Sequence, residues 1–139
     1  MPAFPSIEWF NTVRTAANDN PEFKALGSND TRFGVKIGDQ IVRVDFYAFE
    51  CTGVAEISED DLFDVDFYLE MEPERWQSYI QHIQAAGAAD AQHTINTLDL
   101  NEPGGILKSH DPYRRNNFFR FHLTIQKFFD SAATVETTY

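Results

Sequence analysis

The chain has 139 residues, of which 42% are hydrophobic and 14% are aromatic. This length and apolar content predict one folded domain, 1–139, with a single core, because domains of about 100–150 residues are the commonest size. Eleven Lys and Arg against 22 Asp and Glu give a net charge of −11. Such a charge disfavours binding to nucleic acid or to an anionic membrane surface.

The single cysteine and the apolar pattern give expectations about location. Cys51 cannot form an internal disulfide, so nothing indicates an oxidising compartment, and without a cationic neighbour in sequence its thiol should be inert. The opening MPAFPSIEW lacks the basic and apolar regions of a signal peptide, and no apolar run reaches the roughly 18 residues of a membrane span. We therefore expect a soluble, cytoplasmic protein.

The chain opens with the patterns of two helices. Ser6 can cap a first helix, and Asn20, Pro21 and Gly27 supply the cap, the first-turn proline and the stop of a short second one. Apolar residues recur three and four positions apart in the first: Trp9, Phe10, Val13 and Ala17. This spacing predicts an amphipathic helix that buries one face.

The apolar period then changes to two, which is typical of strands. Alternating stretches at 33–37 and 42–48 meet at the turn Gly38-Asp39 and predict a hairpin. Further strands are expected at 52–57 and 64–71, each with one face buried. The alternation puts three acids on the solvated face of the sheet: Asp45, Asp64 and Asp66.

Three helices complete the pattern. One begins at Pro73 and ends near Gly87, one is indicated at 91–98, and Asp111 with Pro112 starts a long final helix over 112–133. Helices, then consecutive strands, then helices predict an α+β domain. We expect an antiparallel or mixed curved sheet of about four to five strands, covered on one face by helices.

The final helix is more apolar than a core face requires. On a helical wheel, one arc of about 140° holds its core stripe. That stripe is Phe118, Phe121, Ile125, Phe128, Phe129, Ala132 and Ala133. Phe119 and Leu123 extend the apolar arc to about 220°, so the helix must be covered on two sides. The protein's own core, a bound apolar ligand and a homodimer partner are three open alternatives.

The order and spacing of three segments carry a family resemblance. They are FPSIEWFNTVRTAANDNPEFKALG, the hairpin with Gly38-Asp39 at its turn, and DVDFYLEMEPERWQSYI, and the resemblance covers roughly residues 4–84. This arrangement resembles the sterol carrier protein 2 (SCP2-like, sterol-binding) family in its short bacterial single-domain form. Members enclose an apolar tunnel in an α+β fold, so the resemblance implies a carrier of fatty acid, acyl-CoA or a sterol-like molecule.

One segment departs from the family pattern. Before its last helix the family commonly has a GKLKI-like strand and a Gly-Asp pair, whereas this chain has NTLDLNEPGGILKSHDPYRR. The chain also ends VETTY, without the peroxisomal signal of eukaryotic relatives.

The wheel and the resemblance together predict an apolar ligand site along the final helix. Its residues are Trp76, Ile80, Phe118, Phe119, Phe121, His122, Ile125 and Phe129, with Arg114 at the helix start. At a helix N-terminus Arg114 could hold a ligand carboxylate or phosphate, or it could pair with an acidic neighbour. His122 lies inside the apolar arc, where it either makes a buried hydrogen bond or meets a ligand head group.

The residue pattern gives little support for catalysis. We expect no metal or cofactor, because His93, His110 and His122 form no HxxxH or HxH pair, and there is no phosphate loop or nucleophile elbow. One alternative is a small cone-shaped enzyme similar to ketosteroid isomerase and its nuclear-transport-factor-like relatives, with His122 and a buried acid moving a proton. Another is a homodimeric interaction module that buries Phe119 and Leu123.

Overall fold

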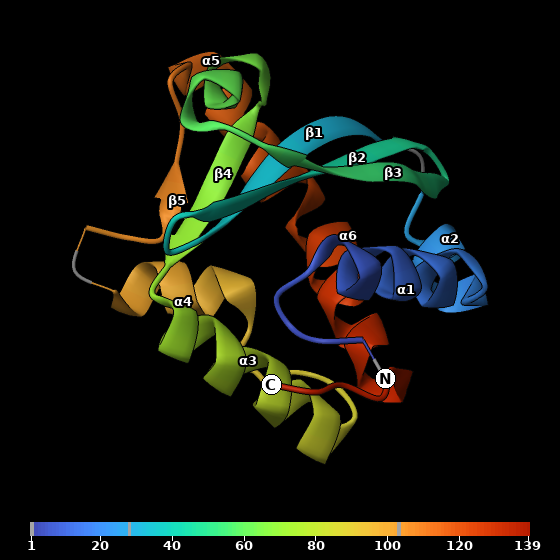
Figure 1. Cartoon of the computed structure of the whole chain (residues 1–139). Helices are drawn as coiled ribbons and strands as arrows, with labels where there is room; N and C mark the ends of the chain where they lie inside the picture. The colour runs from blue at the N-terminus through green and yellow to red at the C-terminus, as the bar shows by residue number, and fades with distance from the viewer. Residues whose placement is uncertain (1, 28, 103) are drawn as a thin grey trace.

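The strands form a five-stranded mixed sheet, and most of the helices lie against one face of it (Figure 1). The computed structural model describes residues 2–27, 29–102 and 104–139. The strand order is β3-β2-β1-β4-β5. The strands are β1 (Asn29–Ile37), β2 (Gln40–Ala48), β3 (Glu50–Ile57), β4 (Phe67–Met71) and β5 (Leu107–Lys108). The sheet is open, and the predicted α+β class is confirmed.

Along the chain, helices lie before, between and after the strands. They are α1 (Ile7–Asn18), α2 (Pro21–Ala25), α3 (Pro73–Ala86), α4 (Ile95–Asn101), α5 (Pro112–Arg115) and α6 (Asn117–Asp130), with 3-10 turns η1 (Glu59–Asp64) and η2 (Ser131–Thr134). Three predicted helix ends are confirmed: Ser6 caps α1, Asn20 caps α2, and Gly87, at φ 88°, ends α3. The helix predicted at 91–98 begins later, at Ile95, where Thr94 is the cap.

The sheet combines a hairpin with a crossover. β1 and β2 pair antiparallel across the turn at Gly38, where φ is +61°, as the alternation predicts. β4 pairs parallel to β1, with Phe33 opposite Phe67, and β5 pairs antiparallel to β4. The fifth strand lies in the segment that departs from the family pattern, and periodicity did not locate it because it is two residues long.

Aromatic rings connect the helices to the covered face of the sheet. The rings of Phe33 and Phe67 stack at 5.5 Å, and Phe118 of α6 meets Phe67 edge-on at 5.6 Å. Further along α6, Phe128 contacts Phe46 of β2 at 5.7 Å. Such pairs add stability beyond the area that they bury. Much of the phenylalanine on α6 is therefore used within the core.

The other face of the sheet is partly covered, which the sequence pattern did not predict. There η1 places Leu62 in a second small cluster with Ile41 and Val65, and Tyr68 packs against it. A Cβ at Gly34 would lie 3.0 Å from Leu62 and from Tyr68, so glycine allows this close approach. Val65 therefore faces this second cluster and not the main core.

The final helix is divided where one continuous helix was predicted. Asn116 ends α5 and precedes α6, and after Asp130 the chain continues only as the 3-10 turn η2. The interruption lies between Arg114 and Asn117, whose side chains both bind Asp66. Two bonds to one carboxylate thus fix the chain on both sides of the break.

The buried thiol of β3 should resist modification in the folded protein. Burial raises the pKa of the fully buried Cys51 to about 12. At mildly alkaline pH, we expect iodoacetamide to label the native protein at least ~100-fold more slowly than protein unfolded in urea, because the thiolate is the reactive form. Mass spectrometry of timed samples measures both rates. Similar rates in the two states would contradict the structure at β3.

Both ends of the described chain lie together near α1 and α3 (Figure 1). Phe4 N–H donates to the carbonyl of Thr138 at 2.8 Å, and Thr138 N–H donates to the carbonyl of Pro2 at 3.0 Å. The indole of Trp9 and the amide of Gln84 both donate to the hydroxyl of Thr137, at 3.0 and 2.8 Å. Side chains from two helices therefore hold the C-terminal segment in place.

Candidate functional site

Most of the side chains predicted to contact a ligand lie in the core. Five are fully buried: Trp76, Ile80, Phe118, Ile125 and Phe129. They pack on other core residues; Trp76, for example, lies 5.7 Å from Phe129 and 5.9 Å from Tyr79, measured between ring centroids. None of the nine predicted residues lines either of the two pockets described below. In this conformation the five core side chains stabilise the fold.

The two apolar residues that exceed a core stripe reach the surface. Phe119 is 46% exposed and Leu123 is 63% exposed, one helical turn apart on α6. His122 is half-buried beside Phe118, with 6.3 Å between ring centroids, and the guanidinium of Arg115 lies 5.7 Å from the Phe119 ring. We call Phe119, His122 and Leu123 of α6, together with Arg115 at the end of α5, the outer strip of α6. Phe121 is half-buried on the other side of the helix, under Arg120.

Arg114 holds a carboxylate, and that carboxylate belongs to the same chain. Nε of Arg114 donates to Oδ1 of Asp66 at 2.8 Å, and Nη2 of Arg114 lies 2.7 Å from the same oxygen. Nη2 also donates to the backbone carbonyl of Asp64 at 2.9 Å. The guanidinium of Arg114 is thus already paired with an acid. Of the two predicted alternatives, the structure shows the acidic partner.

The expectation that Asp66 lies on a solvated face is wrong, since only 8% of the residue is exposed. Its Oδ2 accepts hydrogen bonds from the hydroxyl of Thr31 at 2.9 Å, from the amide of Asn117 at 3.1 Å and from the backbone N–H of Arg32 at 3.3 Å. A buried carboxylate is stable only when its charge and its lone pairs are matched in this way. The start of α6 covers the residue, which no local pattern could reveal.

Polar side chains of α6 organise the loop after α3. Gln126, only 9% exposed, accepts from the backbone N–H of Ile95 at 2.6 Å and donates to Asp130 at 2.8 Å. Asp130 in turn accepts from the N–H of Ala89 at 3.1 Å. Loop residues 87–94 are therefore anchored at both ends by α6.

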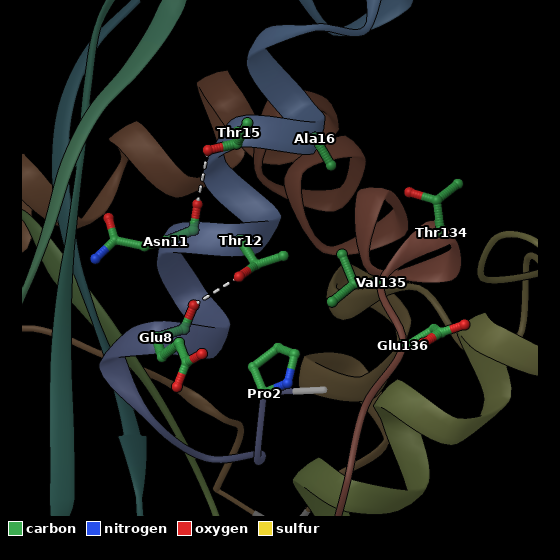
Figure 2. A pocket seen from close by; sticks show the side chains of 9 residues that line it. All are labelled: Pro2, Glu8, Asn11, Thr12, Thr15, Ala16, Thr134, Val135 and Glu136. Atoms are coloured by element: carbon green, nitrogen blue, oxygen red, sulfur yellow. Dashed lines mark hydrogen bonds between the residues drawn. The ribbon is translucent and has the colours of Figure 1, made fainter.

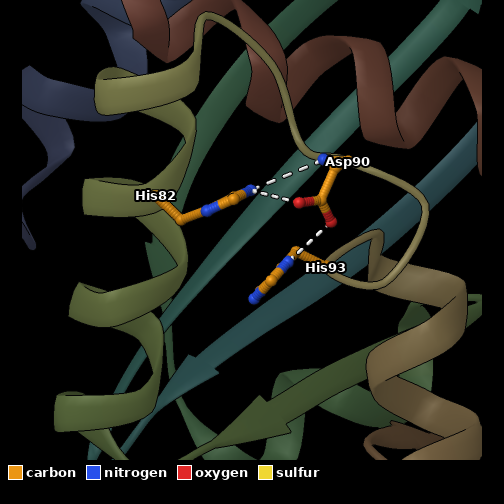
Figure 3. A group of neighbouring side chains, drawn as sticks. All are labelled: His82, Asp90 and His93. Atoms are coloured by element: carbon orange, nitrogen blue, oxygen red, sulfur yellow. Dashed lines mark hydrogen bonds and ion pairs between the residues drawn. The ribbon is translucent and has the colours of Figure 1, made fainter.

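This anchored loop brings two histidines and an aspartate together (Figure 3). His82 projects from α3, while Asp90 and His93 project from the loop. Nδ1 of His93 lies 2.6 Å from Oδ1 of Asp90, and Nε2 of His82 lies 3.7 Å from Oδ2. The two imidazole rings stack with 4.0 Å between centroids. The hydrogen bond from His93 lowers the pKa of the Asp90 carboxyl.

No pattern in the sequence predicted this cluster. The histidines are eleven positions apart, which matches no helical or strand spacing for metal ligands. The available signal was Gly87, because a glycine that ends a helix often reverses the chain. Together with a short loop, that reversal returns His93 to the side of α3 that carries His82.

A cleft adjoins the cluster. Its volume is about 250 Å³, and it lies between α3, the end of β4 and α4. It is lined by Met71, Arg75, Ser78, Tyr79, His82, His93 and Leu98. Arg75 forms an ion pair with Glu102. Both imidazoles of the cluster therefore line a small cavity with mixed polar and apolar walls.

A larger and shallower groove of about 660 Å³ separates α1 from the C-terminal segment (Figure 2). Its lining consists of Pro2, Glu8, Asn11, Thr12, Thr15, Ala16, Thr134, Val135 and Glu136. The hydroxyls of Thr12 and Thr15 already donate to helix carbonyls, at 2.9 and 3.1 Å. Among the described residues, the lining of this groove contains no histidine, cysteine or cationic side chain. The groove is therefore larger than the cleft but offers fewer groups for catalysis or metal binding.

No protein-family model, curated protein or solved structure matches the chain. The resemblance to sterol carrier proteins therefore stays a prediction. Within residues 2–27, 29–102 and 104–139, no helix combines the length and apolarity needed to cross a membrane. The structural features that bear on function are the outer strip of α6 and the cleft beside the two histidines.

Proposed function

We propose that the protein binds and carries an amphipathic apolar molecule, a fatty acid or acyl-CoA, on the outer strip of α6. A single observation carries the proposal: Phe119 and Leu123 are exposed one helical turn apart, with Arg115 over the Phe119 ring and His122 next to Leu123 in the sequence. Contiguous exposed apolar side chains with a polar rim mark binding surfaces. The predicted membership in a lipid-carrying family points to the same class of ligand, which extends to sterol-like molecules.

Charge favours an anionic head group at this place. The protein as a whole carries a net charge of −11, yet Arg114 and Arg115 of α5 directly precede α6, and Arg120 lies in the first turn of α6. Arg114 forms an ion pair with Asp66, whereas the guanidinium of Arg115 lies over the Phe119 ring. A guanidinium at the end of an apolar strip can pair with a carboxylate while the acyl chain covers the two hydrophobic side chains.

Displacement of a fluorescent fatty acid tests the proposal. We expect the wild-type protein to take up one equivalent and Leu123→Asp to weaken binding at least ~10-fold, because burial of a leucine is worth about 1.5–3 kcal/mol. Arg115→Gln should weaken fatty acid binding but not binding of an uncharged long-chain alcohol. Leu100→Asp is the matched control, since Leu100 is 74% exposed on α4, and it should bind as the wild type does.

Two outcomes would contradict the proposal. The first is the absence of uptake by a wild-type protein whose circular dichroism shows that it is folded. The second comes from sedimentation: a wild-type dimer that Leu123→Asp converts to a monomer, with fatty acid binding unchanged, would assign the strip to a homodimer interface.

A further inference from the structure

We infer that His82, Asp90 and His93 form a binding site for one divalent transition-metal ion of the zinc class. Each residue offers one ligand atom, and these atoms all lie within 4.8 Å of one another. The site shares no residue with the outer strip of α6, so it does not depend on the proposed function.

The donor set suits such an ion. Two imidazoles and one carboxylate are ligands that zinc and its first-row neighbours accept, whereas calcium and magnesium prefer oxygen alone. In a tetrahedral site with bonds of about 2.0–2.1 Å, neighbouring donors lie roughly 3.3–3.5 Å apart. Nε2 of His82 and Oδ2 of Asp90, at 3.7 Å, are already near this separation.

Within the described part of the chain, Nε2 of His82 makes only a long hydrogen bond, in which it accepts from the backbone N–H of Asp90 at 3.5 Å. At 3.7 Å, Nε2 of His82 and Oδ2 of Asp90 are too far apart for a direct hydrogen bond. A cation between them would coordinate both atoms. Oδ1 of Asp90 meanwhile accepts from the N–H of Gln92 at 3.0 Å, and a hydrogen bond of this kind orients a carboxylate toward a metal ion.

The surroundings provide both a scaffold and a free coordination position. His82 is in the last turns of α3, and the loop that carries the other two ligands is held by Gln126 and Asp130. Three protein ligands leave a fourth position of a zinc ion open. Because both imidazoles line the cleft of about 250 Å³, that position is available to water or to a small molecule in the cleft.

The side chains are accessible to an ion from solution. The side chain of His82 is 24% exposed, that of His93 is 48% exposed and that of Asp90 is 56% exposed. The net charge of −11 raises the local concentration of cations near the surface. Because the three side chains lie outside the hydrophobic core, we expect their replacement to leave the protein folded.

Calorimetric titration with Zn²⁺ tests the inference on the full chain, without a histidine tag and after treatment with a chelator. We expect one equivalent to bind, and His82→Ala and His93→Ala each to weaken binding at least ~10-fold. Asp90→Asn keeps an oxygen for the Gln92 N–H but removes the charge, so it should also weaken binding. His110→Ala and His122→Ala are matched controls and should stay within about twofold of the wild type.

Two further readouts make the result decisive. Bound Co²⁺ should give the visible absorption of a four- or five-coordinate ion, and Zn²⁺ should raise the melting temperature of the wild type but not of the variants. Equal Zn²⁺ binding by the wild type and the triple variant His82→Ala, Asp90→Ala, His93→Ala would overturn the inference. So would a loss in the two control variants as large as that in His82→Ala. Fatty acid binding by the triple variant reports separately on α6.

Discussion

Replacing Asp66 with alanine is expected to lower the free energy of unfolding by about 3–5 kcal/mol. The substitution removes the acceptor for Thr31, Asn117 and the N–H of Arg32, and it leaves the guanidinium of Arg114 without its carboxylate. Each buried donor that loses its acceptor costs about 1–3 kcal/mol, and Thr31 is almost fully buried, whereas the Arg114 side chain is 38% exposed and adds less to the loss. Urea denaturation followed by circular dichroism measures the loss.

A neighbouring acid provides the control. Asp64 is exposed, and Arg114 contacts its backbone carbonyl and not its carboxylate, so Asp64→Ala should change stability by less than about 0.5 kcal/mol. The double variant Asp66→Ala, Arg114→Met should recover part of the loss, because it removes the unpaired charge as well. If Asp66→Ala lowered stability as little as Asp64→Ala, Asp66 could not be what holds α5 and α6 to the start of β4.

Truncation of Trp76 to alanine is expected to cost a similar amount, about 3–5 kcal/mol. The indole is fully buried on α3, between Tyr79 and Phe129, and its Nε1–H donates to the carbonyl of Lys36 at 2.8 Å. The substitution therefore opens a cavity and leaves a carbonyl of β1 without its hydrogen bond. Thermal and urea unfolding should agree on the loss.

Trp76→Phe should cost less than Trp76→Ala, because it keeps most of the volume and loses only the N–H donor. Leu100→Ala is the control for truncation at an exposed site and should be nearly neutral. Trp76 was also a predicted ligand contact. A stable Trp76→Ala protein with altered fatty acid affinity would show that Trp76 lines a ligand site and that the packed core opens to admit the ligand.

The features that could be predicted from the sequence are those that depend on a few adjacent residues. The caps at Ser6 and Asn20, the turn at Gly38 and the end of α3 at Gly87 each depend on a few adjacent residues, and each was found where expected. The alternation of apolar residues also gave the face of β1 and β2 that meets the helices. From these elements and their order, the α+β class followed directly.

The periodicity of apolar residues could not predict contacts between segments that are far apart in the sequence. Asp66 is buried because Arg114 and Asn117, about fifty positions later, fold over it. The wheel of α6 separated Phe119 and Leu123 from the core stripe, as their exposure shows. It could not show that Phe118 and Phe129 would be covered by the protein's own strands and by α3. The histidine cluster depends on a chain reversal after Gly87 that carries no periodic signal.

The pairing of the two ends of the chain suggests that the sequence could be circularly permuted. Ala3 and Thr138 form a β-bridge, so a flexible linker of about six to eight residues could join the ends without crossing the core. New ends could then be opened at the hairpin turn between Gly38 and Asp39. Such a circular permutant would begin with β2 and end with β1, and the sheet would keep the same neighbours in a different chain order.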